Sequence, residues 1–294
     1  MKIPEELEAD LTAPLHSVRA TLRQNPLLAV GVLGALVIVL VAILAPVIAP
    51  YPEDAGSATH PLNGLQPPSG EHLFGTDQVG RDVFSRVVFG ARVSPVIAAL
   101  VILVSLVIGV GLGIVAGYFG GIVDDVIMRI TDVFLAFPAL LLALAFAAVL
   151  TPSIQTTVIA ISITWWPWYT RLIRGQAASV AGRRYVESAR AVGVRHRVIV
   201  FRHILPNSLT PILVQASLDV GGVILTASAL SFLGLGAQDP TPDWGLMVAQ
   251  GQSFFTTHWW LVTFPGLAIL FTAVAFNLIG DGLRDVLDPH RQMR

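Results

Sequence analysis

The 294-residue sequence has no cysteine and a single lysine, Lys2. Without cysteine, the chain cannot form disulfides, thiolate metal sites or cysteine nucleophiles. A standard P-loop needs a lysine after its glycines to reach the phosphates, so a chain whose only lysine is its second residue cannot carry one. The HExxH zinc motif is also missing, and the histidines are scattered over loops and span edges. A membrane-embedded hydrolase is therefore disfavoured, and no catalytic residue, metal or cofactor is predicted.

Charged residues are scarce as well. They make up 13% of the sequence, whereas hydrophobic residues make up 54%, and the mean hydropathy is +0.72. A soluble domain of this length cannot hide so much apolar surface in one core. The composition therefore predicts an all-α polytopic membrane protein.

The number of transmembrane helices is predicted by counting long stretches of sequence with few charged residues. Crossing about 30 Å of hydrocarbon takes roughly 20 mostly uncharged helical residues. Windows of that kind predict six transmembrane helices, at 25–52, 93–123, 133–150, 152–170, 206–236 and 259–280. The third and fourth share one uninterrupted window, which Thr151 and Pro152 divide as turn residues. The first is too long for the apolar region of a cleaved signal peptide and follows an acidic segment.

Basic residues indicate how the helices are oriented. Lys and Arg are retained on the cytoplasmic side, so a cytoplasmic N-terminus places fifteen of the eighteen basic residues inside. The three exceptions are Arg81, Arg86 and Arg92. Both termini and the loop 171–202 are then cytoplasmic, whereas 51–94 and 238–258 face outward. The net charge of −1 hides this asymmetry, which favours a membrane rather than nucleic acid as the partner.

This topology divides the chain into four parts. Residues 1–25 form a cytoplasmic segment, and 26–92 form the first span and an outer loop. A five-helix core occupies 93–281 and includes a cytoplasmic loop at 171–209. Residues 282–294 form a cytoplasmic tail.

The outer loop contains a short amphipathic segment. Asp77 is expected to cap a helix at the membrane interface, with its apolar side chains facing lipid or the bundle. Its charged side chains are expected to face water or headgroups; they are Arg81, Asp82, Arg86 and Arg92.

Small residues recur every fourth position in the second span. They are Ser105, Gly109, Gly113, Gly117 and Gly121. Such a face lets another helix approach closely, although a role in lining a substrate path stays open.

Asp219 is the single acid deep in the fifth predicted span. An intramembrane carboxylate must face water, a partner or a translocation path. It is therefore a candidate for the path, and a hydrogen bond to a neighbouring helix, such as the one bearing Ser105, is the alternative.

The stretch YVESARAVGVRHRVIVFRHILP, 185–206, interrupts the apolar pattern with four arginines and two histidines. Its spacing predicts a helix, a turn at Gly193 and a second helix. The second apolar stripe consists of Val194, Val198, Phe201 and Leu205. Leu205 precedes Pro206 and is biased out of helical geometry, so the fifth span is expected to begin at Thr210 and Pro211. An alternative reading is that the loop simply lies on anionic lipid.

Four motifs resemble a known family. Glu187, Ser188 and Ala189, followed by Gly193 and by an ending at Leu205 and Pro206, are similar to the EAA loop of permease subunits of ABC importers. The segments FGTDQVGRDVFSRVVFGAR, LSFLGLGAQDPTPDWGLM and FPGLAILFTAVAFNLIGDGLRDVLDP resemble the C-type permease subunit of dipeptide, oligopeptide and nickel importers. Together they extend over 74–289.

The resemblance implies a type I importer (MetI-like) permease bundle that is not itself an enzyme. Its implied partners are a homologous second permease, two cytoplasmic ATPase subunits, an extracytoplasmic substrate-binding protein and membrane lipid, in a bacterial inner membrane. The implied coupling residues are Tyr185, Glu187, Ser188, Ala189, Gly193, Leu205 and Pro206. Pro240, Pro242 and Trp244 are candidates for the outer gate or for contact with the binding protein. A passive channel or secondary transporter is the alternative function, and the substrate stays open.

Overall fold

The computed structural model describes residues 25–287, and every regular element in that range is a helix. The long helices are α2 (Pro26–Ile48), α4 (Ser94–Phe119), α5 (Gly121–Leu135), α6 (Ala139–Val149), α7 (Ile154–Ala181), α10 (Leu205–Phe232) and α12 (Trp260–Leu287). The short ones are η1 (Pro52–Ala55), η2 (Pro61–Asn63), α3 (Val83–Gly90), α8 (Arg184–Ala191), α9 (His196–Ile199), the π-helical turn η3 (Val200–Ile204), α11 (Trp244–Gly251) and η4 (Gln252–Phe254). The predicted terminal segments 1–25 and 282–294 lie outside the described residues, apart from residue 25 and residues 282–287.

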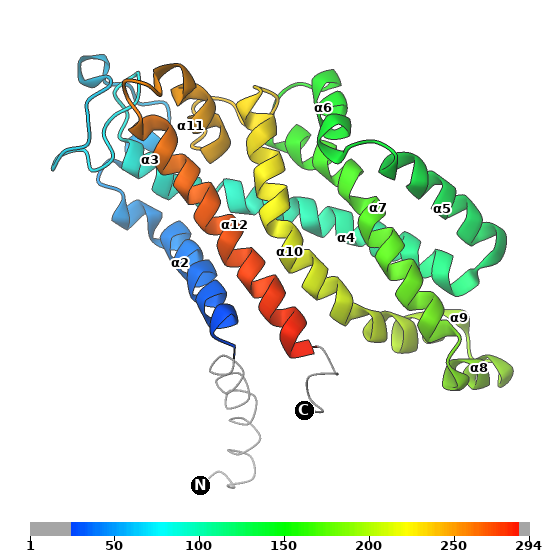
Figure 1. Cartoon of the computed structure of the whole chain (residues 1–294). Helices are drawn as coiled ribbons and strands as arrows, with labels where there is room; N and C mark the ends of the chain where they lie inside the picture. The colour runs from blue at the N-terminus through cyan, green and yellow to red at the C-terminus, as the bar shows by residue number, and fades with distance from the viewer. Residues whose placement is uncertain (1–24, 288–294) are drawn as a thin grey trace, which may run out of the picture.

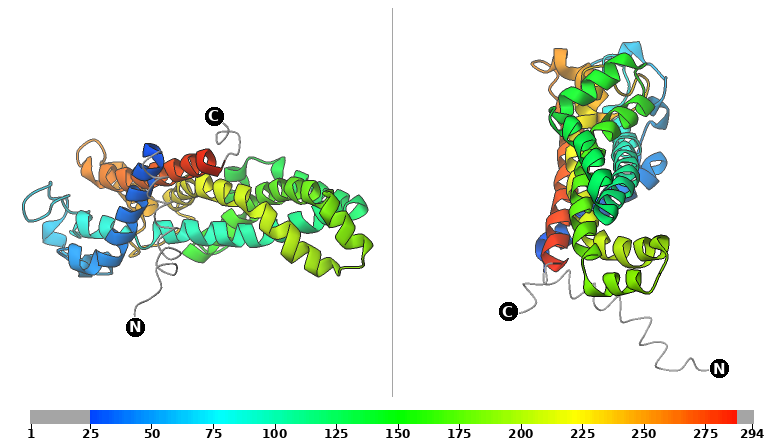
Figure 2. Two further views of the ribbon diagram at one scale, coloured as in Figure 1. Left: turned by 90° about the horizontal axis from the view of Figure 1, so that it is seen from below. Right: turned by 90° about the vertical axis from the view of Figure 1, so that its right-hand side faces the viewer.

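The helices form an elongated bundle with two distinct ends (Figure 1). One end, which we call the cap end, carries η1, η2, α3, α6 and α11. The other, the basic end, carries the starts of α2 and α10 and the ends of α4, α7 and α12. The short helices α8 and α9 protrude at this basic end (Figure 2).

Local sequence explains where several helices begin and end. Side chains that accept a backbone hydrogen bond cap α3, α7 and α11; they are Asp82, Ser153 and Asp243. α4 has a proline in its first turn and ends before Gly120, whose φ of 64° favours glycine. The chain therefore reverses abruptly from α4 into α5.

α4 and α7 pack closely through the small residues of α4. A Cβ added at Gly109 would lie 2.6 Å from Tyr169 Cβ, and one at Gly113 would lie 2.7 Å from Thr170 O. At Gly117 it would lie 2.8 Å from Ala177 Cβ. No larger side chain fits at these positions without a shift of one helix.

Gly121 does not belong to this face, contrary to the sequence pattern. α4 ends at Phe119, and a Cβ added at Gly121 would meet nothing within 4 Å. Its φ of 54° is a conformation that side chains disfavour. Gly121 thus serves the turn into α5 rather than helix packing.

The number of spans differs in part from the prediction. Within residues 25–287, four segments are long and apolar enough to cross a membrane: Pro26–Ile48, Val83–Phe119, Pro211–Phe232 and Trp260–Val286. α5 and α6 together make a fifth, bent by 87° between them. The third span, predicted at 133–150, therefore differs in its bounds and continuity: α5 begins at Gly121, and Pro138 separates it from α6.

α7 corresponds to the predicted fourth span but is not among the strongly apolar helices. Much of it is buried within the bundle, including Thr157, Tyr169 and Thr170 at 0% exposure. Three of its threonine hydroxyls, on Thr157, Thr164 and Thr170, donate to carbonyls of the same chain segment, as in the 3.1 Å bond from Thr170 Oγ1 to Trp166 O. The buried face of α7 meets protein rather than lipid and does not need to be apolar, which explains the mixed sequence of this helix.

The α4–α7 contact yields a stability prediction. We expect Gly113→Ala to lower the melting temperature of the purified chain in detergent, because overpacking costs about 1–3 kcal/mol. Gly111→Ala is the matched control on the same helix, since a Cβ there meets nothing within 4 Å. Replacing a helical glycine by alanine at an open position stabilises by about 0.5–1 kcal/mol. Equal changes in melting temperature for the two variants would contradict close packing of α7 against Gly113.

Candidate functional site

The basic loop between α7 and α10 forms a compact unit, which we call the loop unit (residues 183–204). α8 exposes Tyr185, Glu187 and Ser188 on its outer side and buries Val186 completely. Ala189 is half-buried and packs against the chain's own apolar cluster. The outward surface is therefore made by three of the predicted coupling residues, whereas Ala189 faces inward.

A tight turn joins the two helices of the loop unit. Gly193 has a φ of 80°, and Val194 N donates to Ala189 O at 3.0 Å. Gly193 N donates to Arg190 O, also at 3.0 Å. This pair of bonds is a Schellman motif, which requires a left-handed residue after the helix. The predicted stop at Gly193 is present for that reason.

The loop unit is attached firmly to the ends of α4 and α7. Ile199 and Ile204 are fully buried in a cluster that includes Ile114 of α4 and Ile173 of α7. The Tyr118 hydroxyl lies 2.6 Å from His196 Nδ1. The Arg190 guanidinium stacks 4.4 Å from the Tyr118 ring centroid. Any displacement of the loop unit must therefore move these two helices as well.

The second half of the loop unit departs from the predicted pattern. The expected apolar stripe is exposed at Val198 (42%) and Phe201 (68%), whereas Ile199 and Ile204 are buried. The π-helical turn η3 shifts the helical register, and so a different face meets the bundle.

The fifth span begins at Pro211 as predicted, but the helix that contains it begins earlier, so Thr210 is not its cap. Leu205 is helical, with φ −55° and ψ −52°, and α10 begins there. Pro206 occupies its first turn, where the missing N–H costs nothing. Pro211 lies inside the helix.

Asp219 lies on α10, about 14 residues beyond its start and thus roughly 21 Å from the loop unit along the axis. It is half-buried and accepts a 2.9 Å bond from Gln215 Nε2. Tyr169 of α7 is its neighbour across the helix interface. Ser105, the partner considered from the sequence, is buried, and its hydroxyl has no hydrogen-bond partner among residues 25–287. The structure does not bring Asp219 together with the coupling residues.

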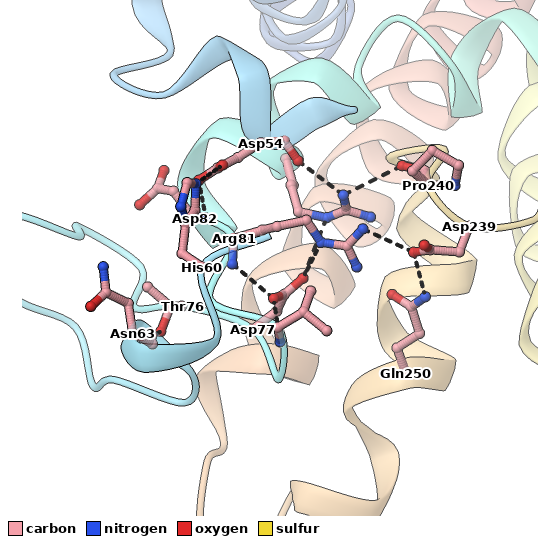
Figure 3. Close-up of polar contacts among 12 residues, drawn as sticks. Asp54, His60, Asn63, Thr76, Asp77, Arg81, Asp82, Asp239, Pro240 and Gln250 are labelled. Carbon is pink, nitrogen blue, oxygen red and sulfur yellow. Dashed lines mark hydrogen bonds and ion pairs between the residues drawn. The ribbon is translucent and has the colours of Figure 1, made fainter. Parts of the chain in front are cut away.

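The cap end contains a second polar site, built from two arginines that the sequence analysis expected to face water (Figure 3). Arg81 and Arg86 are 2% and 1% exposed. Arg81 Nε donates to Asp77 Oδ2 at 2.7 Å, and its Nη1 lies 3.0 Å from Asp239 Oδ1. Arg86 Nη1 donates to Asp54 O at 3.0 Å and approaches Pro240 O at 3.4 Å. The two arginines thus join the outer loop to the segment between α10 and α11.

Two buried carboxylates extend this network. Asp54 Oδ2 accepts from Asp82 N at 2.7 Å, and Asp54 Oδ1 lies 3.0 Å from His60 Nε2. Asp82 Oδ1 lies 3.0 Å from His72 Nδ1, while its other oxygen accepts from Ser85 N. Asp82, not Asp77, is therefore the cap of α3. We call Asp54, Asp77, Arg81, Asp82, Arg86 and Asp239 the outer clasp.

Electrostatics within the clasp favour the charged forms of Arg81 and Asp239. Burial alone would raise the pKa of Asp239, but the hydrogen bond from Gln250 and the Arg81 guanidinium hold it below its ordinary value. Burial would lower the pKa of Arg81, yet the Asp77 carboxylate raises it overall. Both groups are therefore ionised at neutral pH.

The expectation of an exposed interfacial helix at α3 is wrong for Arg81, Asp82 and Arg86. Each of the three finds polar partners inside the cap, which offsets the cost of burial: the arginines meet carboxylates and carbonyls, and Asp82 meets His72 and the Ser85 N–H. Arg92 is exposed as expected, and its guanidinium also bonds to Ile43 O at 3.3 Å. The sequence does contain a sign of this buried network: acids and arginines are grouped within one loop of a chain that is otherwise poor in charge.

The candidate gate residues differ in accessibility. Pro240 is exposed, Pro242 is half-buried and Trp244 is buried at 3% exposure. Trp244 Nε1 donates to Val87 O at 2.9 Å, and its ring packs against Gly90. Trp244 therefore holds α11 against α3 and cannot contact a separate protein directly.

The clasp yields a second stability prediction. We expect Asp77→Asn to lower the melting temperature substantially, because removing one partner of a buried ion pair costs about 3–5 kcal/mol. Glu71→Gln is the control, since Glu71 is an exposed carboxylate in the same loop. Thermal unfolding of the purified chain measures both. Similar melting temperatures for the two variants would argue against a stabilising clasp.

Comparison with known families and proteins agrees with this architecture. A family model described as binding-protein-dependent transport system inner membrane component matches residues 109–292. A second, described as the N-terminal TM domain of oligopeptide transport permease C, matches residues 13–68.

Similar curated proteins extend over nearly the whole chain. A dipeptide transport system permease protein of Alkalihalophilus pseudofirmus is 44% identical over 97% of this chain and 93% of the relative. A probable D,D-dipeptide transport system permease protein of Escherichia coli is 45% identical over 91% and 89%. A glutathione transport system permease protein of Pectobacterium atrosepticum is 43% identical over 92% and 89%.

Solved structures share the fold. A chain of the MetNI methionine ABC transporter, in an inward-facing conformation, aligns with a TM-score of 0.55 at 17% identity, over 69% of this chain and 97% of that one. A chain of an amino acid ABC transporter aligns with a TM-score of 0.51 at 15% identity, over 70% and 94%. The chain has the MetI-like importer permease fold and belongs to the family of binding-protein-dependent transport system inner membrane components.

Proposed function

We propose that this chain is one of two permease subunits of an ABC importer that carries dipeptides, oligopeptides or similar small solutes across a bacterial inner membrane. Relatives at 43–45% identity are named as permeases for dipeptides, D,D-dipeptides or glutathione. A homologous permease, two cytoplasmic ATPase subunits and an extracytoplasmic binding protein complete the assembly. ATP hydrolysis belongs to the ATPase subunits, because this chain has no lysine positioned for a P-loop.

The loop unit is the observation that carries this proposal. It presents the exposed side chains of Tyr185, Glu187 and Ser188 at the basic end, on a helix held by buried Val186. Behind it, Ile199 and Ile204 fix the unit to α4 and α7. A rigid projection attached to core helices can convert the movement of a docked ATPase into a movement of the bundle.

The charge distribution supports a cytoplasmic basic end. Six arginines of the loop unit lie there, namely Arg183, Arg184, Arg190, Arg195, Arg197 and Arg202. At the cap end, Arg81 and Arg86 are buried beside carboxylates. The charges of these two arginines are paired with carboxylates of the cap, so they do not oppose the rule of inside positive charge.

The absence of cysteine permits a direct test of orientation. We expect Ser57→Cys to react with an impermeant maleimide in intact cells and Ser188→Cys to react only after permeabilisation. Both serines are exposed, so access to the reagent decides the result. Labelling of Ser188→Cys in intact cells, with Ser57→Cys protected, would reverse the topology.

Coupling is tested at the turn of the loop unit. We expect Gly193→Val to abolish dipeptide uptake and the stimulation of ATPase activity by loaded binding protein. The left-handed conformation costs a side chain about 1–2 kcal/mol and is worst for a β-branched residue. Gly193→Asn is the matched variant and should keep most activity, because asparagine tolerates this conformation.

A surface variant separates docking from folding of the loop unit. Ser188→Trp adds bulk to the exposed side of α8, whereas Ile122→Trp adds the same bulk to an exposed position at the start of α5. We expect only Ser188→Trp to lose co-purifying ATPase subunits or stimulated hydrolysis. Normal coupled uptake in Ser188→Trp would refute docking through this face, and uptake independent of ATPase subunits would favour a passive channel or secondary transporter.

A further inference from the structure

A groove of about 660 Å³ lies between α4 and the second half of the loop unit. Its volume falls within the roughly 300–1,000 Å³ of sites that bind small molecules. The α4 side is formed by Val107, Val110, Gly111, Ile114, Val115 and Phe119. The opposite side is formed by His196, Arg197, Val200, Phe201 and Leu205. Nine of these eleven residues are apolar or glycine.

Large apolar side chains along this groove are exposed. Val107 and Phe201 are each 68% exposed, and Phe119 is 56% exposed. Gly111 leaves the groove floor open, because a Cβ there would meet nothing within 4 Å. Phe201 belongs to the apolar stripe that the bundle does not bury. The groove therefore continues the lipid-facing surface of α4, a helix apolar enough to span the membrane.

The polar residues of the lining both come from α9. His196 is held by the Tyr118 hydroxyl, whereas Arg197 is exposed and makes no ion pair within residues 25–287. None of the lining residues is acidic. An apolar channel with free positive charge at one end is complementary to an amphiphile that has a hydrocarbon chain and an anionic head.

We propose that this groove binds an anionic phospholipid, with an acyl chain along α4 and its phosphate beside Arg197 and His196. Basic pockets between transmembrane helices on the cytoplasmic side are suited to such headgroups. The bound lipid would bridge α4 to the π-helical turn η3 and so hold the loop unit against the bundle.

The proposal is tested with the full-length chain, purified in detergent with the subunits that accompany it. Dioleoylphosphatidylglycerol and dioleoylphosphatidylcholine are titrated separately, and bound lipid is counted by native mass spectrometry. We expect tighter binding of phosphatidylglycerol. Arg197→Gln should weaken that binding about fivefold without changing phosphatidylcholine binding. Arg195→Gln, an exposed neighbour outside the lining, should have no effect.

Two further variants and a competitor separate the alternatives. Gly111→Trp fills the groove and should abolish retention of both lipids, whereas Gly111→Ala should not. Soluble glycerophosphoglycerol, which lacks acyl chains, should not displace phosphatidylglycerol at comparable concentration. Equal binding of the two lipids, equal effects of Arg195→Gln and Arg197→Gln, or displacement by the free headgroup would each overturn the proposal. Loss of the second permease in Gly111→Trp, with phosphatidylglycerol still bound, would assign the groove to a subunit interface.

Discussion

The close approach of α4 and α7 is the contact on which the other parts of the bundle depend. Hydrocarbon solvates apolar side chains as well as another helix does, so association in a membrane relies on close packing. The small face at Gly109, Gly113 and Gly117 provides that packing along much of α4. At one end of this helix pair, Ile114 and Ile173 support the loop unit. At the other, α3 leads directly into α4 and brings the outer clasp with it. A change in the angle between α4 and α7 would therefore displace both the loop unit and the outer clasp.

The two ends use charge in opposite ways. In the outer clasp, Arg81 and Arg86 are buried and held by carboxylates and carbonyls from three segments of the chain. Such groups are costly to separate, so the clasp keeps α3 fixed to the segment before α11. In the loop unit the arginines are exposed and available to lipid or a partner. A rigid cap and an accessible basic projection are consistent with the proposed function, in which the binding protein docks at the cap end and the ATPase subunits dock at the basic end.

Much of the local structure of the candidate site was visible in the sequence because it depends on local chemistry. The turn at Gly193 follows from the conformational freedom of glycine, and the helix around Glu187 and Ser188 follows from short-range periodicity. The side of the second helix that is buried did not follow, because η3 changes the register by a π-helical turn. Ala189 likewise turned inward, which depends on where α4 and α7 end rather than on its neighbours in sequence. The outer clasp was missed because its partners, Asp54, Arg86 and Asp239, are far apart along the chain.

The sequence by itself determined the membrane environment, the all-helical class, the family resemblance and the positions of most helices. These properties rest on composition, on apolar runs and on motifs that are read from adjacent residues. Only the tertiary structure decided that α5 and α6 are bent apart, that α7 buries a polar face against the bundle, and that Arg81 and Arg86 are buried. Each of these depends on what surrounds a segment in space, because a charge or a hydroxyl is tolerated in the interior only where another part of the chain supplies its partner.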